Sequence, residues 1–284
     1  MTHRRRLQRT YVALSLPALL YLALQIPLLA TATYSALTNE TGALTTDHLR
    51  RVLADPLFGR AVLNNVLLPA ASVALEAAVG LSMALWFYRI RRGKTLWRTL
   101  AIVPFAVPEI VYLLTMKLLF RQHGYLNSLA LNAGLLDQLP GWLTPGSALL
   151  FGVVVLVDAW RVTPLVFLIV LSALEQLDES VVEAATVDGA RTSQVIRFIQ
   201  VPLALPALGV AIALRAVDAF RIFATPLVLV GVQGLPVMTS LAYHYQADLY
   251  DTPAANVVAL ALGLALAVMA LVGFAAVRRR ERLA

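Results

Sequence analysis

Residues 183–202 read EAATVDGARTSQVIRFIQVP, a polar, alanine-rich stretch between two of the most apolar runs in the chain. Ser180 and Glu183 stand at the spacing of a capping box, in which each side chain satisfies a free backbone donor at a helix start. The spacing therefore predicts a short helix that begins at Ser180. Gly189 suits the left-handed conformation that ends many helices, so we expect the chain to turn there.

A second short helix is predicted over residues 192–200, and Val201–Pro202 is expected to lead the chain into the next apolar run. Two interpretations of this loop stay open at this point. It is an amphipathic connector whose apolar residues rest on a membrane surface, or it is a compact, rigid unit that transmits force. Composition alone favours neither of them.

The composition is that of an integral membrane protein. Of the 284 residues, 60% are apolar and 14% are charged, whereas about a quarter of the residues of an average globular domain are charged. The chain has no cysteine, which excludes disulfides, Cys-ligated metal sites and thiol catalysis. Its four histidines are not at metal-ligand spacing, and no nucleophile-and-base set is apparent. We therefore expect no metal site and no catalytic site.

Six apolar runs are each long enough to cross a bilayer, which takes about 20 mostly apolar residues in a helix. The sequence therefore predicts an all-α, polytopic membrane protein with one transmembrane domain over residues 1–284. The predicted spans are 10–37, 62–88, 100–120, 148–174, 203–230 and 254–277, and the loop at 175–202 joins the fourth span to the fifth.

Lys and Arg are concentrated at the N-terminus, after the second span and in the C-terminal tail. The residues are Arg4, Arg5, Arg6 and Arg9; Arg89, Arg91, Arg92, Lys94 and Arg98; and Arg278, Arg279, Arg280 and Arg282. The positive-inside rule places both termini and the loop 175–202 in the cytoplasm. The net charge of +7 is thus explained by membrane topology, and no nucleic-acid partner is expected.

The loop resembles the EAA motif of ABC importer permeases, which work with a solute-binding protein. The resemblance rests on Glu183-Ala184-Ala185, on Gly189 six residues after the glutamate and on Ile199-x-Val201-Pro202, where the family usually has Leu in place of Val201. Further matching segments are Asp188-Gly189-Ala190, Trp160-Arg161 with Pro164, VPFAVP at residues 103–108, Gly124-x-x-Asn127 with Gly134, and residues 218–223, DAFRIF. Together they are similar to the first permease subunit of the carbohydrate-uptake branch, the maltose and glycerol-phosphate type.

The resemblance implies a type I ABC importer permease fold and a coupling helix that docks on a cytoplasmic ATPase. The implied coupling residues are Glu183, Ala184, Ala185, Asp188, Gly189, Ala190, Ile199 and Pro202. The sequence contains no G-x-x-x-x-G-K-[ST] loop, so ATP and Mg are expected on the partner ATPase and no cofactor on this chain. The implied partners are a second homologous permease, two ATPase subunits, an extracytoplasmic solute-binding protein and lipid of a prokaryotic inner membrane.

The expected substrate is a carbohydrate such as a trehalose-like or maltose-like sugar, and glycerol phosphodiesters also stay open. Family members carry a Gly-Gly-Pro turn after the fifth span, whereas this chain has Leu235 in place of the second glycine. The competing function is a channel or secondary transporter that needs no ATPase, because such proteins also carry charged groups at mid-membrane. That function leaves the structured loop without a role. A membrane enzyme is the least favoured class.

Charged residues recur at three-residue spacing inside the fourth and fifth spans. Each costs about 2.5–3.5 kcal/mol at a helix centre, so we expect these side chains to face the protein interior. Two roles compete, structural pairing and contact with a polyhydroxyl substrate. Structural pairing within one helix is favoured for Asp158 with Arg161. In the fifth span the pairing would join Asp218 to Arg215 or Arg221, but two arginines share one acid there, and the pathway role is favoured. The residues predicted to line a translocation pathway are Glu109, Arg215, Asp218, Phe220, Arg221 and Phe223.

Three prolines inside predicted spans also mark this region. Pro104, Pro108 and Pro164 each remove a backbone donor, so we expect kinks close to the pathway. The alternative is that they only fit the packing of neighbouring helices.

Overall fold

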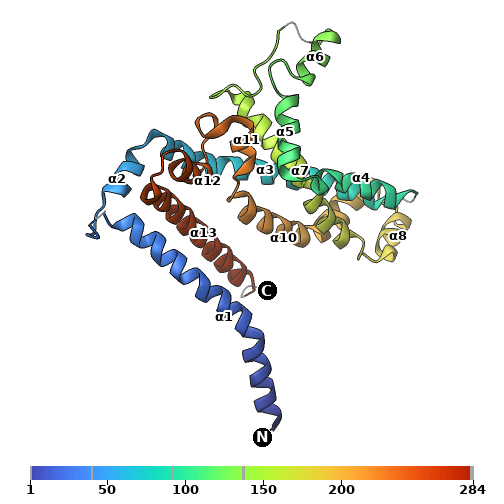
Figure 1. The fold of residues 1–284 in the computed structure, drawn as a ribbon. Coiled ribbons are helices and arrows are strands. Elements are labelled where there is room, and N and C mark those ends of the chain that lie inside the picture. Colours follow the sequence, from blue (N-terminus) through green and yellow to red (C-terminus); the bar gives the residue numbers. More distant parts are fainter. Residues whose placement is uncertain (1, 40, 91, 136–137, 282–284) are drawn as a thin grey trace. The chain divides into compact units, whose positions relative to one another are not determined.

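The computed structural model of the chain describes residues 2–39, 41–90, 92–135 and 138–281, and these residues are almost entirely helical (Figure 1). Within these ranges the β-structure is a single antiparallel bridge between Thr38 and Leu44. The helices are α1 Thr2–Leu37, α2 Asp47–Ala54, α3 Pro56–Tyr88, α4 Lys94–Ala106, α5 Glu109–Leu119, α6 Tyr125–Asn132, α7 Ala148–Leu174, α8 Glu179–Val187, α9 Thr192–Val195, the π-helix η1 Ile196–Gln200, α10 Val201–Ala219, α11 Ala224–Gly234, α12 Met238–Tyr243, the π-helix η2 His244–Asp248 and α13 Thr252–Glu281. The predicted all-α class is confirmed.

Four of the described helical stretches are long and apolar enough to cross a membrane. They are Pro56–Tyr88, Ala148–Leu174, Thr192–Ala219 and Thr252–Gly273. Two bent pairs, α4 with α5 and α11 with α12, raise the number to six if each pair makes one span. In α1, the apolar stretch found is the shorter Ala23–Leu37.

The chain forms two compact units, residues 1–58 with 241–284 and residues 59–240. In the first unit, α1 and α2 both pack against α13. An ion pair of 3.0 Å joins Arg51 of α2 to Asp251, and the same carboxylate accepts a hydrogen bond from the Ala254 amide at the start of α13. The candidate sites described below all lie in the second unit.

Two apolar clusters hold the second unit together. One is built mainly by α5, α7 and α11, with Leu113, Val154 and Leu229 at its centre. The other joins α3, α7 and α10, and in it the rings of Phe87 and Phe167 meet edge to face with centroids 4.8 Å apart. Since lipid is as apolar as these side chains, the contact between such helices comes from close van der Waals packing.

Close packing of α3 on α7 depends on a glycine. A Cβ added to Gly80 would lie 2.9 Å from the side chain of Val166, which is too close for ordinary contact. The missing side chain therefore lets the two helices approach, as small residues do between membrane helices.

Helices α4 and α5 are separated by a bend of 87° at Val107–Pro108. Both residues have extended backbone, and proline disfavours helix in the residue before it. The predicted break is thus confirmed at Pro108. Pro104 and Pro164 lie inside α4 and α7, which continue as helices on both sides of them.

The stretch predicted as one helix over 203–230 is divided in the structure. Helix α10 ends at Ala219 and α11 begins at Ala224, with a turn between them. The turn is stable because other side chains satisfy its carbonyl groups. Asn65 of α3 donates to the Phe220 carbonyl at 2.9 Å, and Thr239 donates to the Ile222 carbonyl. These donors come from distant parts of the sequence, so apolarity alone did not indicate the break.

Candidate functional site

Helix α8, in the loop between α7 and α10, is capped by Asp178. The Asp178 carboxylate accepts a hydrogen bond of 3.0 Å from the Ser180 amide, and this bond lowers the pKa of the Asp178 carboxyl. The predicted capping box of Ser180 and Glu183 is therefore wrong. Asp178 lies two residues earlier, and its short carboxylate is a strong acceptor for the free amide donors of a first turn. Glu183 is thus not used as a capping acid, and its side chain is exposed.

Gly189 ends α8 in the conformation that the sequence predicts, with φ of +83°. The Ala190 amide donates to the Ala185 carbonyl at 2.9 Å, and the Gly189 amide donates to the Thr186 carbonyl at 3.1 Å. This pair of bonds is the Schellman motif, which requires a left-handed residue at Gly189. The next helix then starts at once, because the Gln194 side chain accepts from the Arg191 amide at 2.7 Å.

The second helix of the loop does not end at Val201–Pro202 as expected. Residues Thr192–Ala219 form one helical stretch, made of α9, η1 and α10. The π-turn is the reason that the helix passes Pro202. The Val201 amide donates to the Ile196 carbonyl, one residue further back than in an α-helix. The pattern of backbone hydrogen bonds therefore already departs from that of an α-helix just before Pro202, which has no amide hydrogen to donate.

A groove of about 330 Å³ lies between the turn and the second helix. Its lining residues are Asp188, Gly189, Ala190, Gln194, Val195, Phe198 and Ile199. Large apolar side chains are exposed beside it, Val187 at 87% and Phe198 at 67%. Of the predicted coupling residues, four thus line the groove, Glu183, Ala184 and Ala185 lie on α8, and Pro202 lies in α10. Exposed apolar side chains around a groove are typical of a protein-binding surface.

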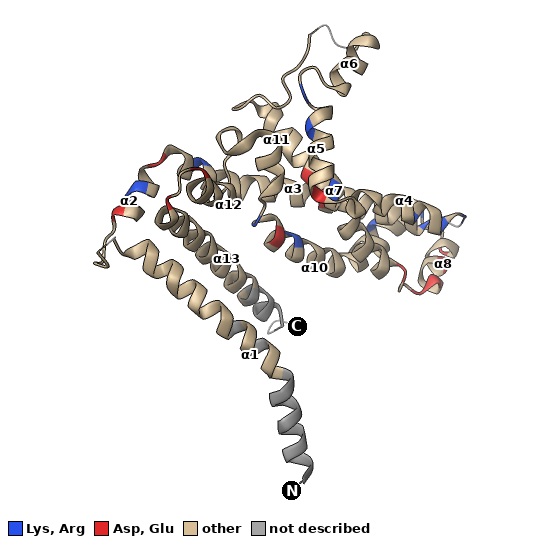
Figure 2. Cartoon of the chain, viewed as in Figure 1, with Lys and Arg blue, Asp and Glu red and all other residues tan. Residues whose placement is uncertain are grey.

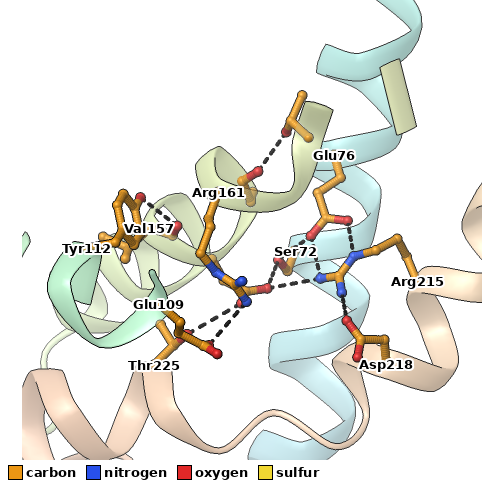
Figure 3. Close-up of polar contacts among 12 residues, drawn as sticks. Ser72, Glu76, Glu109, Tyr112, Val157, Arg161, Arg215, Asp218 and Thr225 are labelled. Carbon is orange, nitrogen blue, oxygen red and sulfur yellow. Dashed lines mark hydrogen bonds and ion pairs between the residues drawn. The ribbon is translucent and has the colours of Figure 1, made fainter. Parts of the chain in front are cut away.

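Arg215 of α10 is the centre of a buried ion-pair cluster (Figure 3). Its guanidinium donates to the two carboxylate oxygens of Glu76 of α3, at 2.6 Å from Nε and 2.8 Å from Nη2. Only 2% of the Arg215 side chain and none of the Glu76 side chain is exposed. Such a two-pronged, charge-assisted contact is among the strongest that side chains make.

The cluster extends to two more acids and a hydroxyl. Arg215 Nη1 donates to Asp218 on the same helix, and Nη2 lies 3.3 Å from Asp158 Oδ2 of α7. The Ser72 hydroxyl lies within hydrogen-bond distance of both buried acids, 2.6 Å from Asp158 and 3.0 Å from Glu76. The cluster therefore joins α3, α7 and α10, and of the two pairings considered for Asp218 the one with Arg215 forms.

Asp158 and Arg161 do not pair with each other, so the pairing predicted within α7 is wrong. Asp158 turns toward Arg215, while Arg161 Nη2 reaches Glu109 Oε1 of α5 at 3.1 Å. Each side chain thus joins α7 to a different helix. Spacing along one helix indicates which partners are possible, but packing of the helices decides which are used.

A cavity of about 190 Å³ lies beside this cluster, in the same unit. Its lining residues are Glu109, Asp158, Arg161, Arg215, Asp218, Ala219, Arg221, Ile222, Phe223 and Ala224. Five of the six predicted pathway residues are among them. The exception is Phe220, whose backbone carbonyl instead accepts the hydrogen bond from Asn65. The Asp218 side chain is 71% exposed and Arg221 is also exposed, whereas Arg215 is enclosed.

Sequence reasoning missed Glu76 and Ser72, which fix Arg215 from the side of α3. A signal for Glu76 was present, since it is the one charged residue in the predicted span 62–88. A charged side chain inside a membrane span is costly in contact with lipid. This argument indicated an interior position for Arg215, and it applies equally to Glu76. Ser72 carried no comparable signal.

Comparison with known proteins adds a family and a fold. Residues 77–283 match the sequence pattern of a family described as "Binding-protein-dependent transport system inner membrane component". Two similar proteins are the trehalose/maltose transport system permease protein MalF of Thermococcus litoralis, 34% identical over 64% of this chain and 61% of the relative, and the trehalose transport system permease protein SugA of Mycobacterium tuberculosis, 31% identical over 75% and 65%. The chain thus spans less than two thirds of the length of either relative.

Among solved structures, one chain of a bacterial ABC transporter involved in the import of the acidic polysaccharide alginate superimposes with a TM-score of 0.82. The superposition covers 97% of this chain and 98% of that one, at 18% sequence identity. A chain of the MetNI methionine ABC transporter gives a TM-score of 0.58 over 78% of this chain. The predicted type I importer permease fold is confirmed by these superpositions.

Proposed function

The chain belongs to the family of binding-protein-dependent transport system inner membrane components, and we propose that it is a permease subunit of an ATP-driven carbohydrate importer. It forms a translocation pathway together with a second, homologous permease. ATP and Mg are bound by two ATPase subunits, and an extracytoplasmic binding protein delivers the solute.

One observation carries this proposal. The helical stretch Thr192–Ala219 starts at the groove beside Gly189 and carries Arg215 and Asp218 to the cavity at its other end. A helix of 28 residues is about 42 Å long, enough to cross a bilayer. A partner that moves the groove can therefore act on the cavity through one continuous element. The exposed Val187 and Phe198 support a protein partner at the groove.

The chemistry of the cavity supports a polyhydroxyl solute. Arg161 and Arg221 offer hydrogen-bond donors, and Glu109 and Asp218 offer acceptors on the same cavity. A sugar that leaves water needs both kinds of group to replace the hydrogen bonds of its hydroxyls. Two relatives are named for trehalose or maltose transport, which further supports a sugar of this class.

The proposal is tested by reconstituting the chain in proteoliposomes with a second permease, an ATPase and a solute-binding protein of the same transport system. Uptake of labelled trehalose or maltose is measured with ATP inside, and again without the ATPase. We expect uptake only with both ATP and the ATPase. Uptake that is independent of the ATPase would instead support a channel or secondary transporter.

Asp218→Asn and Arg221→Gln are each expected to reduce uptake by about tenfold, the effect of one lost hydrogen bond to a charged group. Assembly of the complex should persist, because both side chains are exposed at the cavity. Uptake and copurification of the ATPase are measured for each variant. Arg121→Gln, an exposed arginine outside the cavity, is the control for loss of a positive charge. Lost assembly in either cavity variant would contradict the pathway role.

We propose that the chain lies in the inner membrane with both termini on the cytoplasmic side. Because the natural chain has no cysteine, a single cysteine introduced at Arg4 or Arg282 can be labelled selectively. The side chain of Arg4 and the whole of Arg282 lie outside what the structure describes. We expect both sites to resist a membrane-impermeant reagent in spheroplasts, while Tyr125→Cys, in the connection between α5 and α7, is labelled. The reverse pattern would show the opposite orientation.

A further inference from the structure

Helix α8 is joined to α7 by residues 175–178, a short connection that we call the elbow. Helix α7 ends at Leu174. The amides of residues 176 and 177 donate to the carbonyls of residues 173 and 174 at 3.2 Å, three residues back instead of the four of an α-helix. Asp178 then has extended backbone, with ψ of 120°, before α8 begins. The hydrogen-bond ladder of α7 thus stops before α8. Another contact is needed if α8 is to keep a fixed direction.

Glu175 provides that contact from the first residue of the elbow. Its Oε1 accepts hydrogen bonds from Lys94 Nζ and Arg98 Nη2 at the start of α4. Burial raises the pKa of the Glu175 carboxyl, but the two cations outweigh this effect and the pKa lies below its ordinary value. The carboxylate is therefore ionised at neutral pH. Figure 2 shows basic residues at the start of α4 and acidic residues at α8.

The other end of the α4–α5 pair reaches the cavity. Helix α4 packs along α7 and is followed, after the bend at Pro108, by α5. Glu109, the first residue of α5, pairs with Arg161 at the cavity. Further along α5, Lys117 donates to the Val228 carbonyl of α11 at 2.7 Å. The α4–α5 pair therefore contacts the elbow at one end and the cavity wall at the other.

We propose that Glu175 is a positioning residue for energy coupling, which ties the elbow before α8 to α4 so that movement of α8 displaces the α4–α5 pair and Glu109 at the cavity. This is a second connection between groove and cavity, in addition to the helix over residues 192–219. It rests on the proposed function, because it assumes that a partner moves α8.

A role of Glu175 in stability and a role in coupling predict different effects when the side chain is lost. Ion pairs that are about one third exposed contribute little to folding stability. Loss of Glu175 should therefore leave the fold, the assembly and the ATPase sites intact. If the elbow transmits movement, the same loss should change how much solute is carried for each ATP hydrolysed.

The test compares four variants of the reconstituted complex. Glu175→Gln and Arg98→Glu should each lower the amount of solute transported per ATP by about fivefold, the largest factor expected for a contact of this exposure. The double variant Glu175→Arg with Arg98→Glu reverses the pair and should recover most of the loss. Arg92→Gln removes a nearby charge that makes no ion pair in the described residues, and it should behave as wild type.

Hydrogen exchange of the same complexes gives a readout that does not depend on transport. Amides of α8 should exchange faster in Glu175→Gln and Arg98→Glu, and at the wild-type rate in the double variant. Unchanged exchange, or an unchanged ratio of solute to ATP, would refute the role of Glu175. If the wild-type complex shows no ATP-dependent uptake, the proposed function fails, while the exchange data still decide whether Glu175 positions α8.

Discussion

Replacing Arg215 with glutamine is expected to destabilise the folded chain strongly. The guanidinium neutralises Glu76 and Asp158, whose side chains are 0% and 4% exposed. Without it, two buried acids are left with no ion-pair partner of opposite charge among the described residues. Removing one partner of a buried ion pair costs about 3–5 kcal/mol, a large share of the total stability of an ordinary protein. Yield and thermal stability of the purified chain are the measurements.

Arg221→Gln is the matched control for this variant, because it removes the same group from the same stretch of chain at an exposed position. It should leave yield and stability close to wild type. The double variant Arg215→Gln with Glu76→Gln should be more stable than Arg215→Gln alone, since it leaves one buried charge fewer. Equal stability of Arg215→Gln and Arg221→Gln would show that the buried cluster does not hold the helices together.

The buried cluster also shows where prediction from sequence stopped. The cost of a charge in a membrane indicated an interior position for Arg215, which is buried, and Arg215, Asp218 and Glu109 do line one cavity. It did not identify partners. Asp158 and Arg161 are three residues apart, yet each pairs with another helix. Glu76 and Arg215 are 139 residues apart, and only the packing of α3 against α10 brings them together.

Helix ends were predicted correctly where the residues at the end itself determine them, and were missed where side chains distant in sequence determine them. Gly189 and Pro108 were predicted correctly because their effects depend on the backbone of their own residues. The end of α10 at Ala219 was not predicted, because Asn65 and Thr239 stabilise the turn that follows. At α8 the error was small and local. Two residues of suitable type, Asp178 and Ser180, compete for the cap, and the carboxylate takes it.

Replacing Gly189 with valine is expected to uncouple ATP hydrolysis from uptake or to release the ATPase. The residue has φ of +83°, where a β-branched side chain clashes with its own backbone. A strained conformation of this kind costs about 1–3 kcal/mol. The chain can avoid that cost by abandoning the Schellman bonds of Gly189 and Ala190, which would open the groove beside them.

Alanine variants at Gly189 and Gly152 distinguish strain in the backbone from a clash of the added side chain with neighbouring atoms. A Cβ added at Gly189 or at Gly152 meets no other atom within 4 Å, so neither change causes a clash with neighbours. The two positions differ in backbone, because Gly152 lies inside α7 and Gly189 is left-handed. Gly152→Ala should keep wild-type uptake, since alanine favours helix by about 1 kcal/mol over glycine. Gly189→Ala should lose part of the uptake and Gly189→Val nearly all of it, with ATPase copurification falling in the same order. If Gly189→Val retained both uptake and bound ATPase, the turn at Gly189 would not be needed for docking, and the groove would have to be assigned a different role.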